Sequence, residues 1–456
     1  MDELGRKLME AVKSDDLLIK DLDRLVGQPS VSATGEGMDE CAALMRELLE
    51  RDGFDVRVQR SGTSPHIILA KLSKPKPAGT IILYNHYDVQ PPDPLEEWLS
   101  QPFKLVERDN LLYGRGVADN KGDIAARLAA VRALRKTLGE VPVSMTWVIE
   151  GEEEIGSPNL GKFVKENAHS LIGDICFWEG GDVSHDGRPN FYLGVKGMLY
   201  VEAEVKTASA DRHSMYAPIL PNPAEMISHL IAGLKDGRGR VRVSGFYKDV
   251  KRPSKRERML LTKIPLDLVK LKQSLGATMF LERSPRKALE KLVFDPTCNV
   301  AGLHSGYSGP GAKTIVPSSA TVKIDFRLVP DQNPEKVLLL LKRYMNRYGN
   351  FNLKVHSLSW PVRTDPDHKA VLHSVNAARI VYGSNPLVWP SMFGTGPVYL
   401  FARLGIPSAM LNCVAYQGSN LHSPNENISL QHLHLSAAHM ALTFYNIAKG
   451  GSGPAS

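Results

Sequence analysis

Five side chains of the types that ligate divalent metal ions lie near the ends of apolar stretches in this chain. They are His86, Asp119, Glu154, Glu179 and His422. Acidic groups crowded into one place repel one another, and a divalent cation removes that cost. An aspartate can share its two oxygens between two cations, and a free glutamate beside them can move a proton. These residue types therefore predict a two-metal site suited to the hydrolysis of an amide bond.

Three apolar stretches are expected to place most of these groups at the ends of buried strands. They are GTIILYNHYDV (79–89), VPVSMTWVIEGEEE (141–154) and GDICFWEGG (173–181), and each becomes polar only at its C-terminal end. In open α/β sheets, sites gather at the carboxyl ends of the strands. Between the first two, NKGDIAARLAAVRALRKTLG (120–139) predicts an amphipathic helix that ends at Gly139. The order predicts a βαβ-type sheet with the ligands at one edge.

The pattern changes near Gly194 and changes back near Asp365. GMLYVEAEVKT (197–207) and SATVKIDFRLVP (319–330) alternate between apolar and polar residues, as strands with one exposed face do. Helical patterns follow both, and a third strand completes a strand–helix–strand–helix–strand order. We therefore predict an α/β fold, with an inserted α+β lid in a catalytic domain built on a mixed sheet sandwiched by helices. The predicted boundaries are 1–194 and 364–456 for the catalytic domain and 195–363 for the lid.

The composition is that of a globular protein that binds neither nucleic acid nor a membrane. The 456 residues are 43% hydrophobic and 23% charged, with a net charge of +7. Basic residues are scattered apart from KDVKRPSKRER (248–258), and no basic face with interleaved aromatic residues is evident. No apolar run approaches the ~18 residues of a membrane span. The N-terminal stretch lacks the apolar core of a signal peptide.

The four cysteines and the last residues add two minor predictions. Cys41, Cys176, Cys298 and Cys413 are far apart and form no CxxC motif. They predict reduced core residues of an intracellular, cytoplasmic protein rather than disulfides or a thiolate metal site. The C-terminal GGSGPAS (450–456) predicts a flexible end.

Six motifs spread between residues 86 and 426 carry a family resemblance. They are HYDV, GRGVADNKG, EGEEEIGS, DRHS, GAKTIVPSSATVKIDFRLVP and HSPNE. Together they resemble the M20 family of co-catalytic zinc peptidases, and in particular its larger dipeptidase-type members, the group that contains carnosinases. The resemblance implies two Zn²⁺ ions per subunit, with Mn²⁺ or Co²⁺ as alternatives, and a homodimer formed through the lid.

The resemblance also implies how the ligands are shared. His86, Asp119 and Glu179 would hold one zinc ion, and Asp119, Glu154 and His422 the other. The Asp119–Asn120 peptide is cis in the family and is expected to be cis here. Asp88 would orient His86 by accepting a hydrogen bond from its second ring nitrogen. Asp182 is the alternative to Glu179, which we prefer because it directly ends the apolar stretch.

By the same resemblance, zinc-bound hydroxide would attack the amide carbon. Glu153 would be the general base, because Glu153 and Glu154 match the family's Glu-Glu-x-Gly-Ser pattern. Glu150 and Glu152 are then expected to have an electrostatic or a structural role. His213 would reach the partner subunit's site and stabilise the oxyanion, with Asn222 in the same segment.

Five further residues are predicted to bind substrate. Thr314 and Arg327 match family residues that hold the substrate's C-terminal carboxylate, and the planar fork of arginine suits that task. Gly394 and Thr395 lie in a tight turn whose backbone can approach a ligand. Glu426 follows His422 at the fourth position and is expected to orient it or to contact substrate.

Two departures from the carnosinase pattern keep an alternative function open. Carnosinase-like members more often have aspartate at the position of Glu179. They also carry an acidic residue where this chain has Met392 and Phe393. The prediction is a metallopeptidase that cleaves dipeptides or short peptides with a free C-terminal carboxylate, and the alternative is an N-acyl-amino-acid deacylase. A catalytically silent binding protein would have no need of Glu153 and a complete ligand set. The basic segment between about residues 237 and 297 is open to three roles: contact with substrate, with a partner subunit, or with solvent alone.

Overall fold

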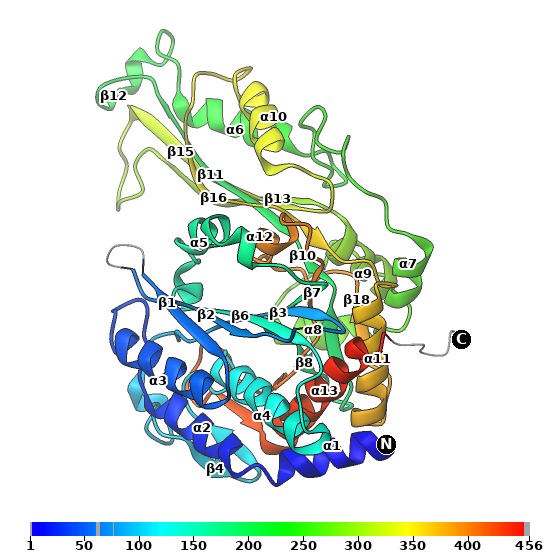
Figure 1. Cartoon of the computed structure of the whole chain (residues 1–456). Helices are drawn as coiled ribbons and strands as arrows, with labels where there is room; N and C mark the ends of the chain where they lie inside the picture. The colour runs from blue at the N-terminus through cyan, green and yellow to red at the C-terminus, as the bar shows by residue number, and fades with distance from the viewer. Residues whose placement is uncertain (1, 61–63, 76, 451–456) are drawn as a thin grey trace.

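The protein is described here by a computed structural model that covers residues 2–60, 64–75 and 77–450. A large mixed sheet with helices on both faces lies below a smaller sheet that carries its own helices (Figure 1). The α/β fold class with a mixed sheet is thus confirmed. All but the first residue of the predicted flexible tail lie outside the described residues. Within these ranges no helix combines the length and the hydrophobicity of a bilayer span.

The described residues form a large sheet of ten strands in the order β1-β2-β6-β3-β7-β19-β9-β8-β20, with β18 beside β9. Its strands are β1 (Asp55–Gln59), β2 (Ile67–Leu72), β3 (Thr80–His86), β6 (Ser144–Glu150), β7 (Ile175–Trp178), β8 (Asp182–Val183), β9 (Pro189–Tyr192), β18 (Leu387–Trp389), β19 (Ser408–Met410) and β20 (Ala415–Tyr416). In the centre, β3 runs parallel to both β6 and β7. The carboxyl ends of these three strands therefore meet at one edge.

Alternate residues of the central strands pack on opposite faces of the sheet, which explains their continuous apolar sequences. Ile81 and Leu83 of β3 face a core shared with the larger helical layer, and Ile82 and Tyr84 face a core under two short helices. The larger layer contains α1 (Glu3–Lys13), α2 (Asp16–Gly27), α3 (Met38–Arg51), α4 (Lys121–Leu138), α11 (Lys369–Tyr382) and α13 (Leu430–Ala448). The short helices are α5 (Leu160–Glu166) and α12 (Tyr399–Ala402), which lie between the sheet and the lid (Figure 1). The predicted helix at 120–139 is confirmed, because Gly139 caps α4.

The smaller sheet is antiparallel, in the order β13-β15-β11-β16. Its elements are β11 (Gly197–Lys206), β13 (Thr297–Ser305), β15 (Ser319–Leu328), β16 (Asn352–Ser359), α6 (Pro223–Leu234) and α10 (Pro334–Met345). Strands β11 and β15 alternate buried and exposed residues, and their buried face packs on α6 and α10. The predicted three-strand order lacked β13. This edge strand is mostly exposed and is interrupted by a bulge between Val300 and Gly302, so its sequence does not alternate cleanly.

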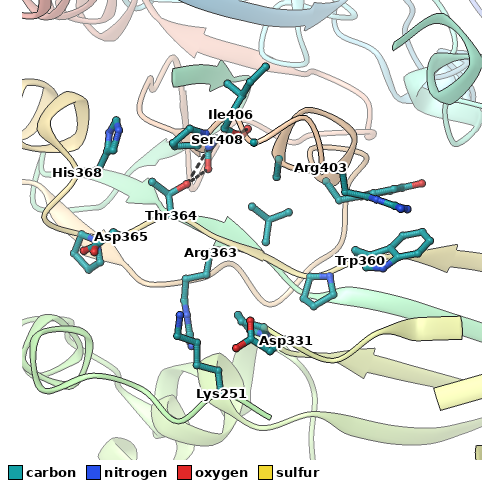
Figure 2. A pocket seen from close by; sticks show the side chains of 18 of the residues that line it. Lys251, Asp331, Trp360, Arg363, Thr364, Asp365, His368, Arg403, Ile406 and Ser408 are labelled. Atoms are coloured by element: carbon teal, nitrogen blue, oxygen red, sulfur yellow. Dashed lines mark hydrogen bonds between the residues drawn. The ribbon is translucent and has the colours of Figure 1, made fainter. Parts of the chain in front are cut away.

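The chain crosses between the two parts at a pair of short strands. Strand β10 (Gly194–Val195) pairs with β17 (Val362–Arg363). A pocket lies beside this crossover, and Figure 2 shows Arg363 pointing across it toward Lys251 and Asp331. None of the five predicted metal ligands lines this pocket. It belongs to the junction between the two parts and not to the predicted site.

The basic segment whose role was open folds into three short helices beside the crossover. They are α7 (Lys255–Leu261), α8 (Leu268–Ser274) and α9 (Pro285–Phe294). Leu261, Val293 and Phe294 form part of a small core against which Trp389 of β18 packs. The carboxylate of Glu257 also forms a buried ion pair with Arg363 at 2.7 Å. The segment therefore packs against the large-sheet part of its own chain.

The four cysteines are free and buried, as predicted.

Candidate active site

Four of the five predicted ligands lie at the edge where the parallel strands end. His86 is the last residue of β3, and it pairs in register with Glu150 at the end of β6. A 3-10 turn that follows β6, Glu153–Ile155, carries Glu154. Glu179 directly follows β7, and Asp119 precedes the first turn of α4. His422 comes from a loop far along the chain, so only the tertiary fold brings it here.

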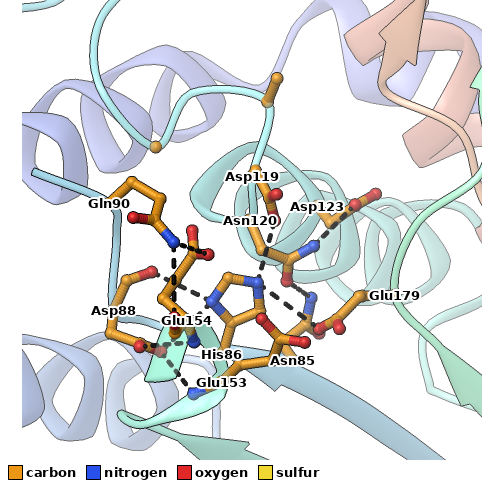
Figure 3. A network of polar contacts seen from close by, with 12 residues as sticks. Asn85, His86, Asp88, Gln90, Asp119, Asn120, Asp123, Glu153, Glu154 and Glu179 are labelled. Carbon is orange, nitrogen blue, oxygen red and sulfur yellow. Dashed lines mark hydrogen bonds and ion pairs between the residues drawn. The ribbon is translucent and has the colours of Figure 1, made fainter. Parts of the chain in front are cut away.

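Asp119 lies between two imidazoles, with one carboxylate oxygen facing each. The Oδ1 atom is 3.0 Å from His86 Nε2, and the Oδ2 atom is 3.1 Å from His422 Nε2. Glu179 lies beside His86, with Oε2 3.9 Å from Nε2, and Glu154 lies beside His422 at 3.3 Å. Figure 3 shows His86, Asp119, Glu154 and Glu179 converging. The five residues thus form two groups that share one aspartate, and the Asp119–Asn120 peptide is cis, as the resemblance implied.

The electrostatics of this cluster fit bound cations. Burial, with nearby acids, raises the pKa of Glu154 to about 7 and the pKa of Glu179 well above its usual range. Burial alone would raise the pKa of Asp119, but hydrogen bonds with His422 and His86 outweigh burial and hold this pKa low. Within the described part of the chain, Glu179 Oε2 is buried without a hydrogen-bond partner. Nitrogen and oxygen donors without thiolate suit zinc, manganese or cobalt.

Asp88 holds the two sides of the cluster together. Its Oδ1 lies 3.3 Å from His86 Nδ1, while its backbone oxygen lies 3.0 Å from the same nitrogen. The backbone N–H groups of Glu153 and Glu154 donate to its two carboxylate oxygens at 3.2 and 3.0 Å. Asp88 is fully buried. It therefore fixes both the ring of His86 and the turn that carries Glu153.

The side chain of Glu153 is turned toward the cluster. Burial raises its pKa, and the charges of His86 and Asp119 act on it. Among the described residues, no group donates a hydrogen bond to its carboxylate. The neighbouring glutamates are engaged elsewhere: Glu150 accepts from Tyr84 and Ser157, and Glu152 accepts from Asn159. Of Glu150, Glu152 and Glu153, Glu153 is thus the one whose carboxylate has no hydrogen-bond donor in the described part of the chain.

Asp182, the alternative to Glu179, lies outside the cluster. Its carboxylate accepts hydrogen bonds from Asn190 and from the hydroxyl of Tyr192 at 3.2 Å. Both partners are on β9, the neighbouring strand. The geometry thus favours Glu179 as the residue available to a metal ion.

Glu426 was predicted to contact substrate or to orient His422, and the structure gives it a different place. Its side chain is only 1% exposed. It forms an ion pair with Arg115 at 2.8 Å and accepts from the backbone N–H groups of Gly116, Ala118 and Asp119 at 2.8 to 3.0 Å. With both oxygens occupied, it cannot bind substrate. It holds the loop that presents Asp119.

Two residues that bond to members of the site, Gln90 and Arg115, were not predicted from the sequence. Gln90 Nε2 donates to Glu154 Oε2 at 2.9 Å, and Arg115 pairs with Glu426. Arg115 belongs to the GRGVADNKG motif. An arginine buried there needs a carboxylate partner, so the motif contained a signal for this pair. No local feature of the sequence singles out Gln90.

The predicted lid residues form two separate groups. His213, on β12 (Arg212–His213), lies near Thr314, whose carbonyl accepts from Ser214 N at 3.1 Å. Strand β12 is at the tip of the lid (Figure 1). Arg327 is at the other end of β15, and its eight-residue offset from Ser319 corresponds to about 26 Å. Thr314 and Arg327 therefore lie far apart within one chain, and a carboxylate held by both would need Thr314 from one subunit and Arg327 from another.

Asn222, the third lid residue of the tip, acts as a helix cap. Its Oδ1 accepts from Ala224 N at 2.9 Å at the start of α6. His213 is exposed, and its Nδ1 accepts from Met215 N. Neither residue contacts the metal cluster of its own chain.

Arg327 of the smaller sheet contacts the predicted tight turn that contains Gly394 and Thr395, on the other side of the crossover. Its Nη1 donates to Thr395 Oγ1 at 2.7 Å, while the carbonyl of Gly394 accepts from Lys196 N at 2.9 Å. Of the apolar pair that precedes this turn, Met392 packs into the core below the short helices. Phe393 is 40% exposed and stands edge-on to Trp389. Phe393 is therefore the member of the pair that a ligand can reach.

Fold and site together define a metal-dependent hydrolase, and comparison with known proteins identifies the family. A family model described as peptidase family M20/M25/M40 matches residues 82–446. Human Beta-Ala-His dipeptidase is 30% identical over 80% of this chain and 74% of its own length. The Cys-Gly metallodipeptidase dug1 of Schizosaccharomyces pombe is 26% identical over 93% of this chain and 94% of its own.

Solved structures agree with these matches. The M20 family metallo-carboxypeptidase Sso-CP2 from Sulfolobus solfataricus has a TM-score of 0.87 at 37% identity, covering 95% of this chain and 100% of that one. Human carnosine dipeptidase 1 has a TM-score of 0.72 at 27% identity, covering 98% and 100%. The chain belongs to peptidase family M20/M25/M40, and it is an enzyme of the metallopeptidase class.

Proposed function

We propose that this protein is a dinuclear metallodipeptidase that hydrolyses dipeptides or short peptides with a free C-terminal carboxylate. The observation that carries the proposal is the shared position of Asp119, whose two oxygens each face one histidine and one half of the ligand set. Two relatives are named dipeptidases, and the Sulfolobus protein is named a carboxypeptidase. Those names all denote peptide cleavage, which the site's residues are suited to perform.

His86, Asp119 and Glu179 would hold one ion, and Asp119, Glu154 and His422 the other. When bound, zinc, manganese or cobalt ions would lower the pKa of the attacking water and polarise the scissile carbonyl. Glu153 would take the proton from that water and deliver it to the leaving amine. Its raised pKa and its lack of a hydrogen-bond donor among the described residues support this role.

The substrate carboxylate would bind Arg327 beside Thr395. One Nη of the guanidinium donates to Thr395, and the planar fork can pair with a carboxylate through its other donors. The backbone of Gly394 closes the same turn. Phe393 adds an apolar surface next to it, which would favour an apolar group on the substrate.

His213, Asn222 and Thr314 would act on the site of a second subunit. All three lie at the tip of the lid, away from the cluster of their own chain. The segment that follows His213 in the chain exposes large apolar side chains: Met215, Tyr216 and Ile219. Exposed apolar groups gathered in this way are typical of protein interfaces. A homodimer through the lid would bring His213 to the partner's oxyanion.

The test is a matched panel of substrates assayed after chelation and after addition of zinc or manganese. It compares free dipeptides with their N-acetylated forms, and free carboxylates with amides. We expect chelation to abolish activity, metal to restore it, and free dipeptides with a free carboxylate to be cleaved fastest. Faster cleavage of the N-acetylated forms would replace the proposal with an N-acyl-amino-acid deacylase and make Phe393 the first residue to substitute.

A further inference from the structure

Helix α4 carries three buried charged residues that the proposed mechanism does not use: Lys121, Asp123 and Arg127. Asp123 and Arg127 lie four residues apart on one face of the helix, and they are 2% and 0% exposed. Burying a charge is costly unless it is paired and hydrogen-bonded. Arg127 meets this condition at the strand ends that carry two proposed metal ligands, and Asp123 meets it through the side-chain amides of Asn120 and Asn412.

Arg127 joins the ends of β3 and β7. Its Nη1 donates to the carbonyl of Tyr84 at 2.6 Å and also to the side chain of Asn85. Its Nη2 donates to the carbonyl of Trp178 at 2.9 Å. The backbone pairing of β3 with β7 ends at Leu83 and Phe177. Arg127 thus bridges the two strands just beyond their last paired residues.

The bridged carbonyls are close to two ligands in the chain. Tyr84 is two residues before His86, and Trp178 is one residue before Glu179. His86 and Glu179 are proposed to hold one metal ion together with the shared Asp119. Glu154 and His422 belong to the other ion. The separation of the backbones of His86 and Glu179 therefore depends on the contact that Arg127 makes.

Asp123 supports Arg127 from the same helix. Its carboxylate charge acts on the guanidinium of Arg127, and its two oxygens accept from the side-chain amides of Asn120 (3.0 Å) and Asn412. Asn120 also bonds to Asn85, the residue that Arg127 contacts at the end of β3. Figure 3 shows Asn85, Asn120 and Asp123 next to His86 and Glu179.

We propose that Arg127, supported by Asp123, is a positioning residue that sets the spacing of His86 and Glu179 for one metal ion; this rests on the proposed function. The guanidinium can bridge two carbonyls because its donors diverge in one rigid plane. The ammonium of a lysine is a single point on a flexible stem and cannot reproduce that bridge. Ligands must be held to within about 0.5 Å for a productive site, so loss of the bridge weakens metal binding.

The experiment compares Arg127→Lys with Arg132→Lys, a matched control on the same helix. The Arg132 side chain is 13% exposed, and it pairs with Asp15, Asp21 and Asp52, away from the ligands. Zinc affinity is measured by chelator competition, the site geometry by the visible spectrum of the Co²⁺-loaded full chain, and folding by the melting temperature after chelation. We expect Arg127→Lys to weaken the binding of one metal ion by about 10- to 100-fold and to alter the Co²⁺ spectrum. Arg132→Lys is expected to change neither.

Wild-type affinity and an unchanged Co²⁺ spectrum in Arg127→Lys would overturn the proposal, whatever its melting temperature. If that variant does not fold, the double variant Asp123→Asn with Arg127→Met removes both buried charges, and it must show the same selective loss of one metal ion. Peptide hydrolysis by the wild type is assayed separately. A wild type that binds two metal ions but cleaves no peptide would sink the proposed function and leave the role of Arg127 standing.

Discussion

At the scale of single residues, the site is a set of acids kept close together by the fold. Glu154, Glu179 and Glu153 all have raised pKa values because they are buried beside one another and beside Asp119. Such an arrangement is unfavourable without a counter-charge, which a divalent cation supplies. Burial thus concentrates negative charge that a metal ion can balance, and it raises the pKa of Glu153, the proposed base.

Substitution of that base tests its role directly. For Glu153→Ala we expect kcat to fall by at least about 10²- to 10⁴-fold, because proton transfer loses its acceptor, while two metal ions stay bound. Metal content by elemental analysis and kcat on a dipeptide are the measurements. Glu152→Ala is the control, since Glu152 bonds Asn159, and it should retain activity. Loss of metal from the Glu153 variant would show that the residue is a ligand instead.

The stability of the metal-free protein should depend on pH with a defined sign. Glu150 is fully buried, and burial raises its pKa to about 8, against hydrogen bonds from Tyr84 and Ser157. In the unfolded chain the pKa of a glutamate is about 4.3. Between these two values the folded state binds the extra proton, so the free energy of unfolding falls as pH rises. Glu154, with a pKa of about 7, acts in the same direction.

We therefore expect a lower urea midpoint at about pH 8 than at about pH 6 in the presence of chelator. Each such group contributes up to about 1.4 kcal/mol per pH unit. Glu150→Gln should flatten the dependence, because glutamine does not titrate. Metal-saturated protein is the control, since cations keep the ligands ionised. A midpoint that rises with pH over this range would contradict the assignment.

At the scale of elements, α7 connects the lid segment to the large-sheet part through a buried ion pair. Glu257 Oε1 lies 2.7 Å from Arg363 Nε, and the side chains are 8% and 4% exposed. Arg363 belongs to β17, one of the two strands at the crossover. The pair therefore fixes α7 to the point where the chain passes between the two parts.

Loss of this buried pair should lower the free energy of unfolding far more than loss of the exposed pair between Arg256 and Asp367. For Glu257→Gln we expect the free energy of unfolding to fall by about 3–5 kcal/mol, because the buried Arg363 loses the carboxylate with which it pairs. The matched control is Asp367→Asn, which removes the exposed pair between Arg256 and Asp367 and should cost about 0–1 kcal/mol. Urea denaturation of both variants provides the comparison. Equal effects would mean that the Arg363 pair is solvated.

At the scale of the whole molecule, the site that we propose would be complete only in a dimer. His213 and Thr314 lie at the tip of the lid, and Arg327 and the cluster of proposed ligands lie elsewhere in the same chain. A lid that lent residues to a neighbouring subunit would explain both this separation and the exposed apolar residues Met215, Tyr216 and Ile219.

Mixing two inactive variants tests whether His213 acts across the interface. Glu153→Ala and His213→Ala should each be inactive alone. After the subunits are mixed and re-associated in equal amounts, half of the dimers are mixed, and each of these has one intact site. We expect about a quarter of wild-type activity to return. Sedimentation of the wild type would establish the dimer, and no recovery in re-associated subunits would place His213 within its own site or outside catalysis.

The sequence by itself was sufficient to predict most of the secondary elements and the sheet edge at which His86, Glu154 and Glu179 lie. Apolar strands that end in acid and the helix capped by Gly139 depend on local periodicity, which a single chain displays directly. The same reasoning missed β13, because an exposed edge strand with a bulge has no clear period.

Only the tertiary structure decided which of these groups meet. It separated Thr314 from Arg327, enclosed Glu426 among backbone N–H groups, and set Glu179 rather than Asp182 beside His86. It also brought Arg127 of α4 against two strand ends more than forty residues away. Local sequence specifies the direction and burial of a side chain along its own element. Contacts between distant segments depend on how the elements pack, and no local pattern encodes that.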